Sequence, residues 1–229
     1  MPSPAVVVPS WQAEPEAVAD EWMCFRQVSP EWPPLYHNAG TPAPDQESGR
    51  WHRVGEGYAQ YLSLAPLGAW AECARYHSLR SAAQAREMRR NLWLVFVRES
   101  RIADLSTFDH YEACGLDPAI AVHPDHTASQ ALGDALRAAG FRGVLSPSAA
   151  LPGVMNLTVF GERYEQVLVG DVAAWPNPDI DAWLPVQQVV EEGPVPVRLT
   201  TETVFRTKKH LAYREWMQAK GRDPGATAP

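Results

Sequence analysis

Apolar and polar residues recur along this chain with different periods, and each period predicts a type of element. Residues 92–97 form an unbroken apolar run, which is typical of a strand covered on both faces. Between Leu67 and Ala74, apolar residues follow the i, i+3, i+4, i+7 spacing of a buried helical stripe. Pro66 suits the first turn of a helix, because proline lacks the N–H that this position leaves unpaired. We therefore predict a strand at 92–97 and a helix that starts at Pro66.

A second helix is predicted to follow residue 126. Thr127 and Gln130 have the spacing of a capping box, and Gly140 suits the position just past the helix end. Strands outnumber the two clear helices and no βαβ repeat is present, so the pattern predicts an α+β fold. Further strands are expected at 23–28, 58–62, 143–146, 156–160 and 166–170, and further helical segments at 82–90 and 208–220.

The placement of proline divides the chain into three segments. Of 21 prolines, nine lie in residues 1–44 and seven in residues 171–229, whereas only five lie between these segments. Proline interrupts helices and strands, so its excess marks irregular flanks. We predict a loose N-terminal arm at 1–21 and a compact body at 22–170. The C-terminal extension, 171–229, is expected to be partly irregular with a short helix.

Composition and charge argue against several classes of protein. The net charge of −7 disfavours nucleic acid as a direct partner, since binding phosphates needs a basic surface. No apolar run approaches the ~18 residues that a membrane span requires, and the first residues lack the basic segment of a signal peptide. The three cysteines are widely spaced, which favours buried thiols over disulfides. We therefore expect a cytoplasmic protein without a membrane partner.

Polar residues beside turns of the compact body are the candidates for chemistry. Arg50 closes the proline-rich loop, and its guanidinium could hold a phosphate or carboxylate through two hydrogen bonds. Glu72 lies off the apolar stripe of the first helix, where it is either an exposed residue or a carboxylate aimed into a cleft. Ser148 and Asn156 flank a strand–turn–strand corner, where they either bind a ligand or satisfy turn backbone groups.

Two other chemistries are disfavoured by spacing. His123 and His126 lie on a proline-containing loop without a third ligand at a familiar spacing, so no metal site is predicted. Ser148 is not expected to be a hydrolase nucleophile, because no Gly-x-Ser-x-Gly turn surrounds it.

Taken in order, several short motifs of the chain resemble the RES domain family. The family is named for an Arg, a Glu and a Ser, which correspond here to Arg50, Glu72 and Ser148. The resemblance runs from about Trp22 to Glu165. It is carried by Phe25-Arg26, Gly49-Arg50-Trp51, Tyr61-Leu62-Ser63-Leu64, Ala71-Glu72, the helix from Thr127 to Gly140, Leu145-Ser146-Pro147-Ser148, Gly153 and Asn156.

This resemblance implies a fold, an activity and a partner. The fold would be α+β, with a mixed sheet like that of ADP-ribosyltransferases. The activity would be that of a bacterial toxin that cleaves the nicotinamide–ribose bond of NAD with water or phosphate, without a metal or other cofactor. The partner would be an Xre-like antitoxin, with self-association of the toxin inside the complex.

The resemblance also implies roles for individual residues. Glu72 would stabilise the positive charge that develops on the ribose, and Arg50 would assist catalysis and hold the pyrophosphate. Tyr61 would stack on the nicotinamide, or it is an aromatic residue of the core. The expected NAD-binding residues are Arg26, Arg50, Tyr61, Ser148 and Asn156.

Two departures from the family pattern lie beside these residues. His52 stands where relatives often have Asn or Ser, and Ala149-Ala150 stand where many have a bulkier residue and an Arg. Two alternative functions therefore stay open. One is an ADP-ribosyltransferase that modifies a protein, and the other is a binding module without activity.

Overall fold

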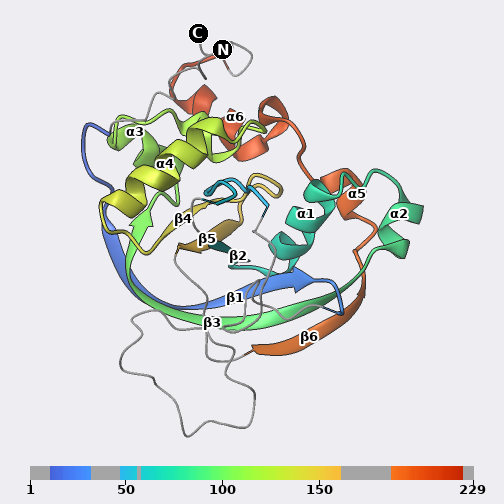
Figure 1. The fold of residues 1–229 in the computed structure, drawn as a ribbon. Helices are drawn as coiled ribbons and strands as arrows, with labels where there is room; N and C mark the ends of the chain where they lie inside the picture. Colours follow the sequence, from blue (N-terminus) through green and yellow to red (C-terminus); the bar gives the residue numbers. More distant parts are fainter. Residues whose placement is uncertain (1–10, 32–46, 56–57, 161–186, 224–229) are drawn as a thin grey trace, which may run out of the picture.

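The fold is described from a computed structural model, in which residues 11–31, 47–55, 58–160 and 187–223 are placed (Figure 1). Two long antiparallel strands, β1 (Ala17–Val28) and β3 (Arg89–Asp104), form a curved ribbon. A third strand, β6 (Gln187–Pro194), pairs antiparallel with the first half of β3. In Figure 1, β1 and β3 lie below the helices.

Three shorter strands close the ribbon into a ring. Strand β2 (Ala59–Ser63) meets the end of β1 where Phe25 pairs with Ser63, and β5 (Met155–Phe160) follows beside it. Strand β4 (Gly143–Pro147) pairs antiparallel with β5 and parallel with the end of β3. The expected α+β class with a mixed sheet is therefore confirmed.

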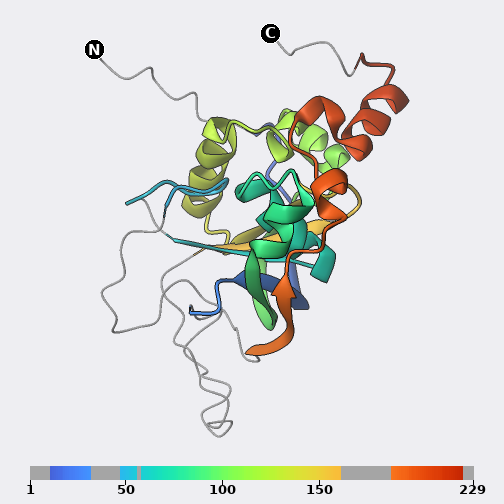
Figure 2. The same ribbon diagram turned by 90° about the vertical axis from the view of Figure 1, so that its right-hand side faces the viewer.

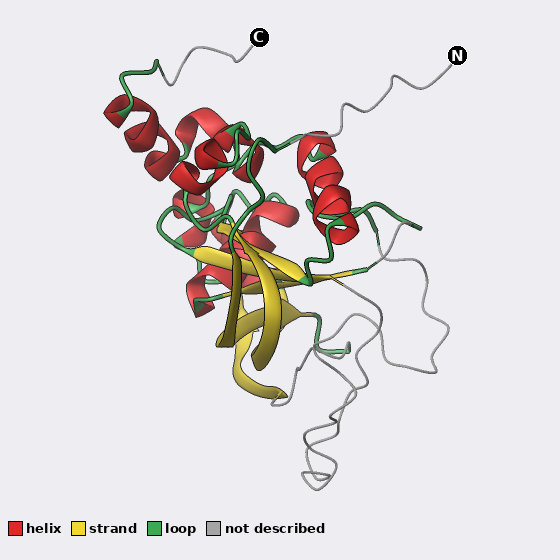
Figure 3. Cartoon of the chain, turned by 90° about the vertical axis from the view of Figure 1, so that its left-hand side faces the viewer, coloured by secondary structure: helices red, strands yellow, loops and turns green. Residues whose placement is uncertain are grey.

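The helices gather on one side of the strands (Figures 2 and 3). Helix α1 (Pro66–Tyr76) begins at the proline that predicted it, and α4 (Thr127–Ala138) occupies the second predicted position. No helix within the described segments is long and apolar enough to cross a membrane. The remaining helical elements are α2 (Ala82–Glu87), α3 (Phe108–Ala113), η1 (Pro118–Ala121), α5 (Leu199–Glu202), η3 (Thr207–Lys209) and α6 (Leu211–Ala219).

Three apolar clusters hold these layers together. The first lies inside the ring of strands and includes Leu62 of β2 and Leu157 of β5. The second packs α4 against α3 and α6, and Trp51 from the loop at residues 47–55 is buried among these helices. The third surrounds α1 and includes Leu199 from the C-terminal part of the chain. The three cysteines are free and buried, as the sequence predicted.

Several element predictions need correction. Strand β1 begins at Ala17, inside the segment expected to be a loose arm, because β3 is long enough to pair with it. The predicted helix at 82–90 ends at Glu87, and Arg89 and Arg90 begin β3. The division of the chain at residues 21 and 170 stays a prediction, but β6 adds part of the extension to the sheet.

The capping box predicted at the start of α4 is wrong. Thr127 is the first helical residue, and its hydroxyl donates to Asp125 at 2.7 Å. The Gln130 side chain instead donates to the carbonyl of Gly49 at 2.9 Å. The strand predicted at 166–170 lies outside the described residues, whereas the predicted C-terminal helix is present as α6.

The packing of α4 yields a test of stability. Leu136 is fully buried in the second cluster, so Leu136→Ala leaves a cavity and should lower the free energy of unfolding by about 2–5 kcal/mol. Leu211→Ala is the matched control, because Leu211 is 55% exposed. Urea unfolding of both variants measures the difference. Equal losses in the two variants would contradict the described packing of α4.

Candidate active site

Glu72 lies at the centre of a small polar cluster. It is half-buried on α1, whose neighbouring residues Ala71 and Cys73 face the core. One carboxylate oxygen, Oε1, accepts hydrogen bonds from Ser148 Oγ at 2.6 Å and from Asn156 Nδ2 at 2.7 Å. The structure thus brings together three residues that the sequence singled out separately.

The pairing of β4 with β5 explains why Ser148 and Asn156 meet. Ser148 follows the last residue of β4, and Asn156 lies on β5 opposite Ser146. The Ser148 hydroxyl also accepts the backbone N–H groups of Ala150 at 3.2 Å and Leu151 at 3.1 Å. Because a hydroxyl has one proton and two lone pairs, these three bonds use it completely. Ser148 therefore orients Glu72 in this structure.

The two donors leave the second oxygen of Glu72 available. Both hydrogen bonds go to Oε1, and no described residue donates a hydrogen bond to Oε2. A carboxylate that is held at one oxygen and open at the other can accept a hydrogen bond from a ligand without rotating. The cluster is thus arranged to present a fixed negative charge.

Arg50 lies close enough to Glu72 for their charges to interact. Its Nη1 atom donates to the carbonyls of Ile120 at 3.2 Å and His123 at 2.9 Å. Burial lowers the pKa of the Arg50 guanidinium, and the Glu72 carboxylate opposes this shift. An arginine stays protonated in proteins, so the centre combines a cation with a carboxylate. The two carbonyls leave other N–H groups of this guanidinium for a ligand.

Arg75 is a second cation of the centre, and it is not among the site residues predicted from the sequence. It lies on α1 three residues after Glu72, on the same side of the helix. Its Nη1 atom donates to the carbonyl of Val204 at 2.7 Å and to that of Ala149. Burial lowers the pKa of Arg75 as well, and Glu72 again opposes the shift. The i, i+3 spacing from Glu72 is the signal in the sequence that could have identified it.

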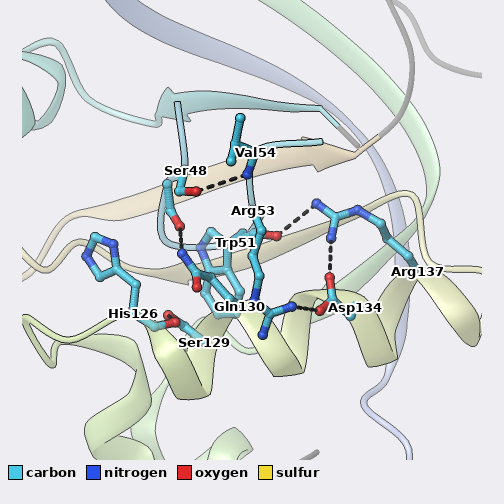
Figure 4. A network of polar contacts seen from close by, with 10 residues as sticks. Ser48, Trp51, Arg53, Val54, His126, Ser129, Gln130, Asp134 and Arg137 are labelled. Carbon is cyan, nitrogen blue, oxygen red and sulfur yellow. Dashed lines mark hydrogen bonds and ion pairs between the residues drawn. The ribbon is translucent and has the colours of Figure 1, made fainter. Parts of the chain in front are cut away.

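The loop that carries Arg50 is fixed to α4 (Figure 4). Gln130 binds the Gly49 carbonyl at 2.9 Å, and Arg137 Nη2 binds the Trp51 carbonyl at 2.8 Å. Helix and loop approach closely at Gly133, where a Cβ atom would lie 2.4 Å from the Trp51 carbonyl oxygen. The backbone on both sides of Arg50 is therefore held by one helix. Figure 4 also shows the ion pair between Arg53 and Asp134.

Tyr61 holds the same loop from the opposite side. Its hydroxyl accepts the N–H of Trp51 at 2.9 Å and shares a hydrogen bond of 2.8 Å with Nδ1 of the buried His52. Gly49 is needed here, because a Cβ atom would lie 2.4 Å from the Tyr61 hydroxyl. Burial raises the pKa of Tyr61. The departure at His52 therefore has a structural role, and the stacking of Tyr61 on nicotinamide stays a prediction.

Arg26 lies on β1 and binds a neighbour in the sheet. Its Nη1 atom donates to Gln60 on β2. The positive charge of Arg26 acts to lower the pKa of Tyr61, though less than burial raises it. Its contact with pyrophosphate stays a prediction.

Two histidines near the arginines have pKa values below the ordinary value of histidine. Burial lowers the pKa of His126 to about 4, with further lowering by Arg50 and Arg75. Burial also lowers the pKa of His210, whose side chain is almost completely buried. Within the described segments, no group of three or more His, Cys, Asp or Glu side chains is arranged to hold a metal ion.

Comparisons with known proteins give this geometry a context. The chain is 33% identical over 164 residues to the probable NAD(+) phosphorylase Rv3189 of Mycobacterium tuberculosis. The aligned region covers 71% of this chain and 78% of that protein. Its fold is similar to that in a crystal structure of the M. tuberculosis MbcT–MbcA toxin–antitoxin complex. The TM-score is 0.56 at 21% identity, over 75% of this chain and 85% of the other. The model of the RES domain matches residues 20–178. Since this match covers well over half of the sequence, the chain belongs to the RES domain family.

Proposed function

We propose that this chain cleaves the bond between nicotinamide and ribose in NAD, and that it acts as the toxin of a toxin–antitoxin pair. The observation that carries the proposal is the Glu72 carboxylate, which is held at one oxygen by Ser148 and Asn156. The similarity to a protein named as a probable NAD(+) phosphorylase supports NAD as the substrate. The similarity in fold to a toxin from a toxin–antitoxin complex supports an antitoxin as the partner.

The proposed reaction needs stabilisation of charge more than acid catalysis. Nicotinamide departs as a neutral molecule from a cationic nitrogen, and positive charge develops on the ribose. A fixed carboxylate beside the sugar stabilises this charge, because it needs no reorganisation during the reaction. The Oε2 atom of Glu72 would accept a hydrogen bond from a ribose hydroxyl, while Ser148 and Asn156 keep Oε1 in place. Ser148 would thus act by orienting Glu72.

The two arginines suit the anionic part of NAD. Arg50 has N–H groups beyond the Nη1 atom that binds Ile120 and His123, and these would bind a pyrophosphate oxygen. Arg75 is held by backbone carbonyls, so it would contribute mainly positive potential. Arg26 remains the candidate for a second phosphate contact. No metal enters this scheme.

The acceptor of the ADP-ribosyl group decides between related activities. Water would give ADP-ribose, phosphate would give ADP-ribose 1″-phosphate, and a protein side chain would give a modified protein. All three activities would use the same NAD pocket and the same carboxylate. The proposal includes water and phosphate as acceptors. Transfer to a protein is the alternative.

Replacement of Glu72 tests the central role. In Glu72→Gln an amide nitrogen stands at one carboxylate position and the negative charge is gone, so nicotinamide release should fall by at least ~100-fold. Glu215→Gln on the exposed side of α6 is the matched control and should keep wild-type activity. Release of nicotinamide from NAD is measured for both. Turnover near wild type in Glu72→Gln would remove this carboxylate from the mechanism.

Replacement of Arg50 tests binding. Loss of a charged hydrogen bond to phosphate is worth about 1.5–3 kcal/mol, so Arg50→Ala should raise the KM for NAD by roughly 10–100-fold. Arg214→Ala, at an exposed position of α6, is the control for the loss of one positive charge. Steady-state kinetics of both variants give the comparison. An unchanged KM in Arg50→Ala would argue against the phosphate contact.

The products identify the acceptor. NAD labelled in its ADP-ribose part is incubated with purified protein, with and without inorganic phosphate, and the products are separated by mass. We expect the label in small molecules. If phosphate is the acceptor, the phosphorylated product should form only in the sample that contains phosphate. Label retained on protein would favour the transferase alternative. Absence of nicotinamide under both conditions would contradict the proposed function.

A further inference from the structure

The C-terminal part of the chain reaches the Glu72 centre, although the family match ends at residue 178. We infer that His210 is a positioning residue for this centre, acting through the turn formed by residues 148–151. The inference rests on the proposed function, because it assigns His210 a part in the same reaction. Hereafter residues 148–151 are called the Ser148 turn.

His210 makes two hydrogen bonds with different partners. Its Nε2 atom donates to the carbonyl of Ser148 at 2.9 Å, and its Nδ1 atom accepts the N–H of Tyr213 at 3.2 Å. Since a carbonyl can only accept and an N–H can only donate, the ring carries its proton on Nε2. The side chain is 1% exposed, and the ring of Phe108 packs edge-on against it. His210 is therefore a fixed, neutral donor aimed at the backbone of Ser148.

Neighbouring contacts make His210 one of three supports for the Ser148 turn. The carbonyl of Ala149 accepts from Arg75, and the carbonyl of Ala150 accepts from the N–H of Val204 at 2.8 Å. Arg75 also binds the carbonyl of Val204, so it links the turn to the C-terminal segment. Three successive carbonyls of the turn are thus held by α1 and by residues 204–210.

These supports matter because the geometry of the turn sets the position of a hydroxyl. Ser148 Oγ must lie 2.6 Å from Glu72 while it accepts the N–H groups of Ala150 and Leu151. A displacement of about 1 Å in a catalytic group can lower the rate by roughly 100-fold. Loss of the bond from His210 frees the first carbonyl of the turn, and Glu72 then loses a fixed partner.

The two bonds of His210 also separate two roles. The bond to Tyr213 caps the first turn of α6, which is a structural role. The bond to Ser148 contributes nothing to that cap. A variant that keeps one bond and loses the other therefore distinguishes support of the helix from support of the catalytic centre.

Asparagine and glutamine provide this pair of variants. The Asn oxygen occupies the place of Nδ1 and is a good helix cap, but the side chain is too short to reach the Ser148 carbonyl. The Gln amide nitrogen occupies the place of Nε2 and can donate to that carbonyl, but it cannot cap Tyr213. His210→Asn removes the support of the turn, and His210→Gln removes the cap.

We expect the two variants to differ in their kinetics. His210→Asn should lower kcat for nicotinamide release by about 10–100-fold with KM within about twofold, because a group that acts in the transition state is displaced. Its Tm should also fall, because the buried carbonyl of Ser148 loses its donor. His210→Gln should keep kcat within about threefold, while loss of the cap lowers Tm by about 2–4 °C.

A second measurement does not depend on activity. The N–H groups of Ala150 and Leu151 are bonded to Ser148 Oγ, so their hydrogen exchange reports the geometry of the turn. Exchange at both amides should accelerate by at least ~10-fold in His210→Asn and stay near wild type in His210→Gln.

The outcomes distinguish this inference from the proposed function. Wild-type kcat and unchanged amide exchange in His210→Asn would overturn the inference, as would an equal loss of kcat in both variants. If the wild-type protein releases no nicotinamide, the proposed function fails. The exchange measurement then still decides whether His210 holds the Ser148 turn.

Discussion

Two hydrogen bonds to one oxygen of Glu72 set the requirements for the rest of the structure. These bonds form only where α1, the end of β4 and the start of β5 lie close together. Pairing of β4 with β5 brings Ser148 and Asn156 to the same edge, and the first and third apolar clusters hold that edge and α1 in place. The loop that carries Arg50 depends on a separate set of bonds, from α4 and Tyr61, so Arg50 and Glu72 are positioned independently.

The sequence predicted the elements better than it predicted their contacts. Pro66, the apolar stripe after it and Gly140 located two helices, because such signals act within a few residues. Gln130 was assigned to a local cap but binds the Gly49 carbonyl 81 residues away. A local pattern carries no information on such a partner. For the same reason no local pattern points to His210, whose partner Ser148 is 62 residues away.

The residues that depart from the family pattern, His52 and Ala149-Ala150, lie among contacts between separate segments of the chain. His52 is buried and bonds to Tyr61, so it helps to hold the loop that carries Arg50. Ala150 is fully buried in the same cluster as Val195 and Leu199, so a longer side chain there would require its neighbours to move. The small residues of the turn and the segment that covers them therefore belong to one arrangement. Neither residue had a visible role in the sequence.

The long sequence separations within the centre have a consequence for biosynthesis. Glu72 and Ser148 are 76 residues apart, Glu72 and Asn156 are 84 apart, and His210 lies a further 62 residues beyond Ser148. Contacts of this range require long loops to close, so they cannot form until all of these segments have been synthesised. A nascent or misfolded chain therefore has no assembled centre. Under the proposed function, a chain therefore gains full activity only after residues up to His210 have been synthesised and folded.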